Sequence, residues 1–309
     1  MPALLTHYEF FKTVEPNTST IGLIGAQGPD PFFYYGCGIS KNKKDKDLRN
    51  YGTLLHSVDP YITFKYLLEY IMGALDNEKP YLIEFTKGLL AHYLLDRNCH
   101  PYIWYKSGFV TEKDNNPSKY FNSHTTIESS IDVLVMDKFK DNTTTFNSLK
   151  YDKKAMKIVT KMMFSLGKVC YQNKNIKINS FKKAVDQMHF VQRALYSKTG
   201  KKKAYIDKHF KNTPLSSMSE DKVENLKLDY LNLNHKVWRD CVTNLNPRKD
   251  DFFKLFDNAK KEYTVFSKLF DDVLNGKTKI TEIDKYFNKI DHNGFKVNAV
   301  KVYSDYIFE

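Results

Sequence analysis

The chain has 309 residues, of which 41% are hydrophobic and 15% aromatic, enough apolar material for a large core and too much for a disordered protein. No run approaches the roughly 18 consecutive apolar residues of a membrane span. The first eleven residues lack the basic start and long apolar stretch of a secretory signal. We therefore expect no transmembrane segment and a cytoplasmic protein.

The formal net charge of +12 is distributed unevenly. Residues 1–140 carry 15 Lys and Arg against 16 Asp and Glu, whereas residues 141–309 carry 33 against 20. The second half can attract nucleic acid, an anionic membrane surface or another phosphate-rich partner. The alternative is a solvated helical surface, and we favour it because the lysines of this half are interleaved with acidic residues. Four widely spaced cysteines without a CxxC pair are expected to be free thiols.

Apolar residues recur at helical spacing in most long segments, which predicts an all-α fold with irregular loops. Strand-like alternation is almost absent, and prolines stand mainly at helix starts or in connectors. The connectors include 22–38, 41–50 and 173–180, and we treat 1–309 as one domain. The predicted helices are Tyr61–Leu75, Leu82–Leu95, Ile127–Phe139, Ala155–Val169, Phe181–Leu195, Val223–Leu231 and Phe252–Leu274.

Histidine placement is the most informative feature of the chain. Five of the nine histidines fall within the first 124 residues, near acidic residues. A histidine and an acid four positions apart on a helix lie about 6 Å apart on one face, where they can share a metal ion. The other four histidines have no such neighbours and are expected to be isolated: His189, His209, His235 and His292.

Two segments contain such a pair. In GLLAHYLLDRNCHP, His92 and Asp96 continue an apolar stripe, so both should point into the protein. In NSHTTIESSIDVLVM, His124 and Glu128 repeat the arrangement. A single pair of this kind in a helical core is more often a hydrogen bond than a metal site. Two inward pairs favour metal, because they would form a pocket of imidazoles and carboxylates.

Three further histidines support a metal site. His100 lies one turn after Asp96 and just before Pro101, where we expect the helix to end, and it can reach a neighbouring ion. His7 and His56 add two more imidazoles. Mixed imidazole and carboxylate ligands without cysteine suit zinc, and three protein ligands per ion leave room for water, as in catalytic sites. Several ions a few ångströms apart can hold a phosphodiester and stabilise its leaving oxygen.

The order of these residues also carries a family resemblance. His7, the GAQGPDPFFYYG loop with Asp30, His56, HYLLD with His100, and HTTIE together resemble the zinc-dependent phospholipase C family of bacteria, which is related to the fungal single-strand-specific nucleases. The motifs cover residues 1 to about 135. The resemblance implies a multi-helix fold of the phospholipase C and nuclease type, up to three Zn²⁺ ions, and a phosphodiester hydrolase whose metal site is built from residues 1–135.

The resemblance also implies which residues bind each ion. The first set is Asp30, His56, His92 and Asp96, and the second is His100, His124 and Glu128. The third ion would take His7, Asp96 as a bridge, and the amine and carbonyl of the first residue of the mature chain. Family members usually have tryptophan there, whereas this sequence begins with Met1-Pro2. Removal of Met1 would make Pro2 that ligand.

The implied reaction is attack by water held between the ions, with Asp30 orienting or deprotonating it. The aromatic residues after Asp30 can form a wall that stacks a base or surrounds a quaternary ammonium group, or they can be core residues. These residues are Phe32, Phe33 and Tyr34.

Phospholipid is the first expected substrate, and single-stranded nucleic acid or another phosphoester is the alternative. A non-catalytic helical protein that keeps metal for stability, or binds a partner through its basic half, is the rival interpretation. A structural zinc site needs four ligands, and the chain offers at least eight candidates, which favours an enzyme. The sequence does not indicate an oligomeric state.

Overall fold

The computed structural model describes residues 4–111, 114, 116–197, 199–210 and 227–308, and the predicted all-α class is confirmed. Within these residues the only strand-like pairings are two isolated bridges, Trp238 with Arg248 and Ile290 with Lys296. No helix in the described part of the chain combines the length and apolar character needed to cross a membrane. The helices are α1 (Leu4–Val14), α2 (Thr20–Gly25), α3 (Lys43–Ser57), α4 (Pro60–Met72), α5 (Lys79–Ser107), α6 (Ser123–Phe139), α7 (Lys153–Ser165), α8 (Ser180–Leu195), α9 (Lys201–His209), α11 (Phe252–Leu274) and α12 (Asp284–Phe287).

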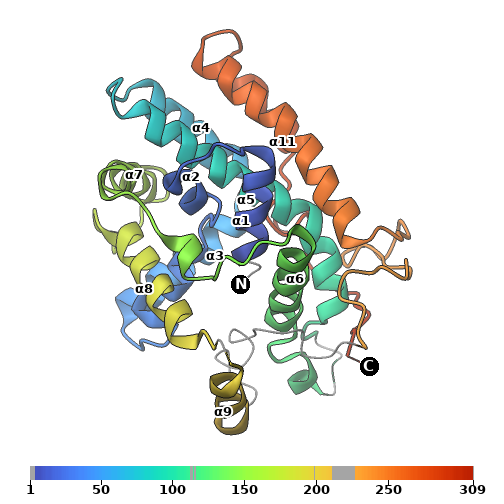
Figure 1. Ribbon diagram of the computed structural model, residues 1–309. Helices are drawn as coiled ribbons and strands as arrows, with labels where there is room; N and C mark the ends of the chain where they lie inside the picture. The colour runs from blue at the N-terminus through green and yellow to red at the C-terminus, as the bar shows by residue number, and fades with distance from the viewer. Residues whose placement is uncertain (1–3, 112–113, 115, 198, 211–226, 309) are drawn as a thin grey trace.

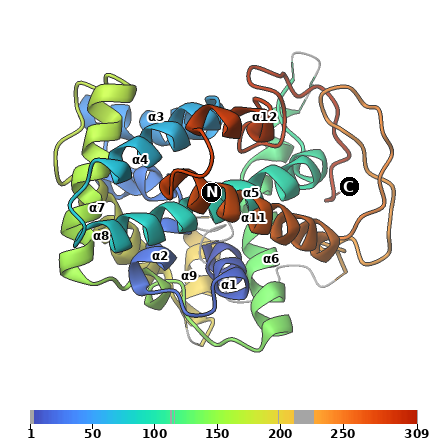
Figure 2. The same cartoon turned by 90° about the horizontal axis from the view of Figure 1, so that it is seen from above.

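Helix α5 is the central element, and it runs through the middle of the bundle in both views (Figures 1 and 2). Helices α2 and α11 pack directly on it. The approach of α2 depends on glycine, because a Cβ on Gly88 would overlap the carbonyl oxygen of Gly22. This close contact brings the loop after α2, with Asp30, next to the face of α5 that contains His92 and Asp96.

Helix α5 continues to Ser107, so the expected end near Pro101 is wrong. A proline inside a helix removes one N–H group and leaves the carbonyl of Arg97 without its usual helical partner. The C-terminal segment packs on this turn so closely that a Cβ on Gly294 would overlap the Arg97 carbonyl oxygen. Tertiary packing therefore supports the turn, and α5 carries three candidate ligands on one continuous helix.

Four predicted helices are found with modest shifts, Leu82–Leu95 is the middle of the much longer α5, and Phe252–Leu274 matches α11 at both ends. The prediction of a helix at Val223–Leu231 is wrong for residues 227–231, which form turns, and 223–226 lie outside the described residues. Helix α3 begins inside the stretch 41–50 that we expected to be a connector, because the Asn42 side chain caps it by accepting from the Lys44 amide. Shorter helical turns lie at Asp30–Gly38, Pro117–Tyr120, Asn147–Leu149, Leu166–Cys170 and Ile280–Ile283.

Helix α1 is fixed to α6 through Asp132. The first-turn amides of Leu5 and Thr6 lie 3.0 Å and 2.8 Å from the carboxylate oxygens of Asp132, and the Thr6 hydroxyl donates to the same group at 2.7 Å. First-turn amides have no partner within their own helix, so this distant carboxylate acts as the cap. The contact sets the position of His7, the next residue along α1.

A single hydrophobic core contains residues from every helix named above except α9. It includes aromatic contacts between distant helices, such as Phe10 of α1 with Phe256 of α11. The four cysteines are free thiols, as predicted. The C-terminal third of the chain therefore packs against the same core as the first half and reaches the centre of the molecule.

Candidate metal centre

The structure brings the predicted ligands of the described residues into one connected cluster on α1, α3, α5, α6 and the turn Asp30–Gly38. Pro2, the remaining predicted ligand, lies outside the described residues. The clustered residues are His7, Asp30, His56, His92, Asp96, His100, His124 and Glu128.

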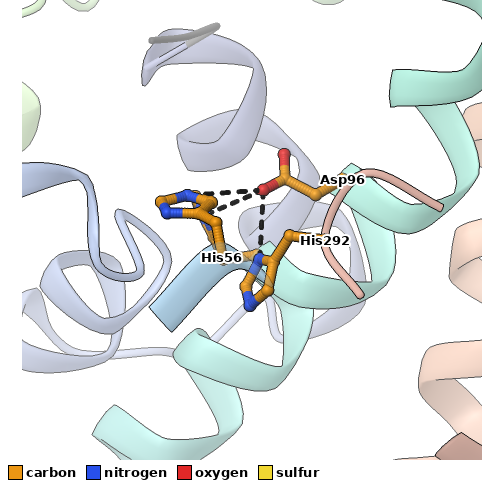
Figure 3. A group of neighbouring side chains, drawn as sticks. His56, Asp96 and His292 are labelled. Atoms are coloured by element: carbon orange, nitrogen blue, oxygen red, sulfur yellow. Dashed lines mark hydrogen bonds and ion pairs between the residues drawn. The ribbon is translucent and has the colours of Figure 1, made fainter. Parts of the chain in front are cut away.

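Asp96 lies at the middle of the cluster. Its Oδ1 is 3.1 Å from Nε2 of His7, and its Oδ2 is 3.0 Å from Nε2 of His92. The same Oδ2 is 4.0 Å from Nε2 of His56 and 3.2 Å from Nδ1 of His292 (Figure 3). Burial alone would raise the pKa of this carboxyl, but the surrounding imidazoles outweigh burial and hold the pKa well below its usual range. The Asp96 carboxylate is therefore ionised, and its two oxygen atoms could contact more than one ion.

Asp30 and Glu128 each face imidazole nitrogens as well. Oδ1 of Asp30 is 3.1 Å from Nε2 of His56, while its Oδ2 is buried without a hydrogen-bond partner among the described residues. Oε1 of Glu128 is 3.2 Å from Nε2 of His100 and 3.0 Å from Nε2 of His124. Two donor atoms bound to one tetrahedral zinc ion at 2.0–2.1 Å lie about 3.3 Å apart, so these separations suit a shared ion.

The other nitrogen of three imidazoles is held by the backbone. A carbonyl oxygen only accepts, so each of these Nδ1 atoms carries a hydrogen, and each Nε2 is left for a proton or a metal ion beside a carboxylate. Such backbone contacts fix the tautomer and orientation of metal-binding histidines in proteins. The pairs are His56 with Gly52 at 2.8 Å, His92 with Ala26 at 3.1 Å, and His100 with His292 at 2.6 Å.

The pKa directions fit a site that exchanges protons for metal. Burial lowers the pKa of both His7 and His124, which keeps these imidazoles neutral and their lone pairs available. Burial would also lower the pKa of His100, but Asp96 and Glu128 outweigh it and raise that pKa to about 9. In the metal-free protein His100 holds a proton that a bound ion would replace.

Three groups of side chains place their ligand atoms within 4.8 Å of one another and could hold a metal ion. Glu128 and its two histidines reproduce the second set implied by the resemblance. The other two groups share His92, and they differ from the implied sets because Asp30 joins His7 while His292 joins His56 and Asp96. The groups are His56, His92, Asp96 and His292; His7, Asp30 and His92; and His100, His124 and Glu128.

His292 is the cluster residue that sequence reasoning missed, and the expectation that it is isolated is wrong. It follows α12 and is 196 positions from Asp96, so no helical spacing connects the two. Its backbone amide donates to the carbonyl of His56 at 3.1 Å, and its side chain is buried. The site is therefore not confined to residues 1–135.

The other three histidines of the second half contact neighbours outside the cluster: His189 with Phe146, His209 with Tyr205, and His235 with the Lys249 carbonyl.

The predicted aromatic wall is only partly at the site. Phe32 and Tyr34 are buried in the hydrophobic core, where the Tyr34 hydroxyl accepts from Gln192 at 2.7 Å. Phe33 stacks on His56 with ring centres 5.3 Å apart. Of the three, Phe33 is the residue placed against a candidate ligand.

Trp104 is a second aromatic neighbour of the cluster and was not predicted. Its ring centre lies 4.1 Å from that of His124, and its indole N–H donates to Asn293 at 2.9 Å. Among the candidate ligands, His124 and His56 have the more exposed side chains, at 18% and 15%. An aromatic ring therefore lies against each of the two candidate ligands with the more exposed side chains.

Comparison of the chain with protein-family models, with curated proteins and with solved structures gives no significant match.

Proposed function

We propose that this protein is a zinc-dependent phosphodiester hydrolase that acts on phospholipid in the manner of the phospholipase C family it resembles. The observation that supports this most directly is that the group containing Glu128 adjoins two overlapping groups, which His92 can serve one at a time because its Nδ1 is held by Ala26. Ions held a few ångströms apart suit the in-line displacement of a phosphodiester. Imidazole and carboxylate ligands without cysteine suit zinc.

Bound zinc would supply Lewis acidity and a water that ionises near neutral pH. The chain's own residues hold and orient the reactants. Burial alone would raise the pKa of Asp30, but the hydrogen bond with His56 and the electrostatic attraction of His92 and His56 together outweigh burial and lower the pKa, so Asp30 is ionised at neutral pH. Its partnerless Oδ2 can accept a hydrogen from a water molecule, which fits the role of orienting or deprotonating the nucleophile.

The two aromatic neighbours support an organic head group near the more exposed ligands. Phe33 on His56 and Trp104 on His124 offer ring faces beside the metal groups. Aromatic faces attract quaternary ammonium ions, and the bases of nucleic acids also stack on them. The excess of basic residues in 141–309 favours single-stranded nucleic acid as the second candidate substrate.

The proposal is tested by zinc content and a substrate panel. Purified protein should contain about two to three zinc ions per chain and release the head group from phosphatidylcholine vesicles, and a strong chelator should abolish turnover until zinc is restored. Preferential cleavage of single-stranded DNA over phospholipid would identify a nuclease instead. Bound zinc without cleavage of phosphatidylcholine, single-stranded DNA or an artificial phosphodiester would identify a non-catalytic helical protein stabilised by metal.

A further inference from the structure

The segment after α12 brings a residue into the cluster that the family resemblance does not supply. We propose that His292 is a metal ligand, and that its Nδ1 joins His56, His92 and Asp96 in a four-ligand set of three nitrogens and one oxygen. The inference rests on the proposed function in one respect, that this centre binds zinc.

The position of His292 is fixed from several sides. The Tyr93 hydroxyl donates to the carbonyl of Ile290 at 2.9 Å, and the Asp291 amide donates to the carbonyl of Phe295 at 2.8 Å. Gly294 has φ +79°, a left-handed conformation that suits glycine, and it packs on the proline turn of α5. The loop is a tight turn anchored to α5, and this anchoring fixes the position of the His292 side chain.

The backbone of His292 contacts two candidate ligands while its ring faces a third. Its amide donates to the His56 carbonyl at 3.1 Å, and its carbonyl accepts from Nδ1 of His100 at 2.6 Å. Its Nδ1 lies 3.2 Å from Oδ2 of Asp96, and Figure 3 shows this ring and that of His56 directed at the same carboxylate oxygen. The separation is close to that of two ligands on one tetrahedral ion.

A fourth ligand from His292 has a consequence for Asp30. Three imidazoles and one carboxylate oxygen complete a tetrahedral zinc site, so Asp30 is no longer required as the fourth ligand of that ion. One carboxylate oxygen of Asp30 lies within 4.8 Å of ring nitrogens of His7 and His92. An Asp30 carboxylate that this ion does not require can act on water through Oδ2, which has no hydrogen-bond partner among the described residues.

The alternative is that Nδ1 of His292 only donates a hydrogen bond to Asp96 and positions it. Two isosteric variants separate the two roles, because the side-chain atoms of Asn and Asp occupy the place of Nδ1. His292→Asn keeps an N–H donor there but is a poor zinc ligand, whereas His292→Asp offers an oxygen ligand but no donor. His235→Asn is the matched control, because His235 is exposed and bonds the Lys249 carbonyl outside the cluster.

The readouts are zinc per chain, zinc affinity by chelator competition, and circular dichroism to confirm folding. Loss of a residue that only hydrogen-bonds to a ligand typically weakens metal binding 10- to 100-fold. We expect His292→Asn to lose one ion or to bind it more weakly by at least that factor. His292→Asp and the control should retain the ion. Wild-type zinc content and affinity in His292→Asn would overturn the inference. Equal loss in the Asn and Asp variants would also overturn it, because a carboxylate oxygen at that position is itself a zinc ligand.

The same measurements separate this inference from the proposed function. Wild-type protein with fewer than one zinc ion after reconstitution would overturn both. Wild-type protein that binds zinc but cleaves no phosphodiester would overturn only the proposed function, and the zinc content of the variants would still decide the role of His292.

Discussion

The two carboxylates of the cluster are surrounded in different ways. Glu128 faces His124, four positions before it on the same helix, and His100 from the neighbouring α5. Asp96 is surrounded by imidazoles from α1, α3, α5 and the loop after α12, which span almost the whole chain. We call these the Glu128 group and the Asp96 group. The side chains of the Glu128 group come from two packed helices, whereas those of the Asp96 group come from three helices and a distant loop.

The largest expected effect comes from breaking the Asp96 group. Asp96→Asn removes the charge that lies within 4.0 Å of five imidazoles, so we expect loss of more than one zinc ion and a fall of at least about 10²–10³ in turnover of an artificial phosphodiester. Zinc analysis and initial rates measure both. His189→Ala is the control and should be near neutral, because its aromatic neighbour is Phe146, outside the cluster. Equal losses in the two variants would mean that the centre has been misplaced.

Breaking the Glu128 group should have a narrower effect. Glu128→Gln removes the carboxylate between His100 and His124, so we expect loss of one zinc ion while the ions of the Asp96 group remain. Zinc per chain, measured beside Asp96→Asn, gives the comparison. Loss of all zinc from Glu128→Gln would show that the two groups bind metal as one unit.

The same contrast explains what the sequence could predict. Helical spacing puts two histidine–acid pairs each on one helix face, so the sequence predicts them. These pairs are His124 with Glu128 and His92 with Asp96. The position of His292 in the cluster cannot be predicted from spacing, because only the packing of its loop on the turn of α5 at Pro101 brings it to Asp96.

The fold shows a similar division. Helix α11 is predicted at both ends because its apolar period is strong, whereas α3 was missed because its first turns are mostly charged. The end of α5 was misplaced because the contacts that support Pro101 come from residues near Gly294, about 190 positions away.

The anchoring of His7 tests how far the Asp96 group depends on the fold. Asp132→Ala would leave the first-turn amides of Leu5 and Thr6 and the Thr6 hydroxyl without their buried acceptor. We expect a loss of about 3 kcal/mol in the free energy of unfolding and weaker zinc binding at the ion contacted by His7, with the Glu128 group unaffected. Urea titration and zinc affinity measure the two effects. Asp137→Ala, at an exposed position on the same helix, should change neither.

The smallest expected effect is a difference in pH dependence between the groups in chelator-treated protein. Burial lowers the pKa of His292 to about 3 from an ordinary value of 6.5, so its contribution to stability is present above pH 6.5 and is lost as the pH falls below it. Asp96 and Glu128 outweigh burial and raise the pKa of His100 to about 9, so its contribution is present below pH 6.5 and is lost as the pH rises through 9. Thermal unfolding between pH 4 and 10 measures both. His292→Asn should make the melting temperature depend less on pH on the acid side of the profile. His100→Asn should do the same on the alkaline side. A change on the same side in both variants would contradict the division into two groups.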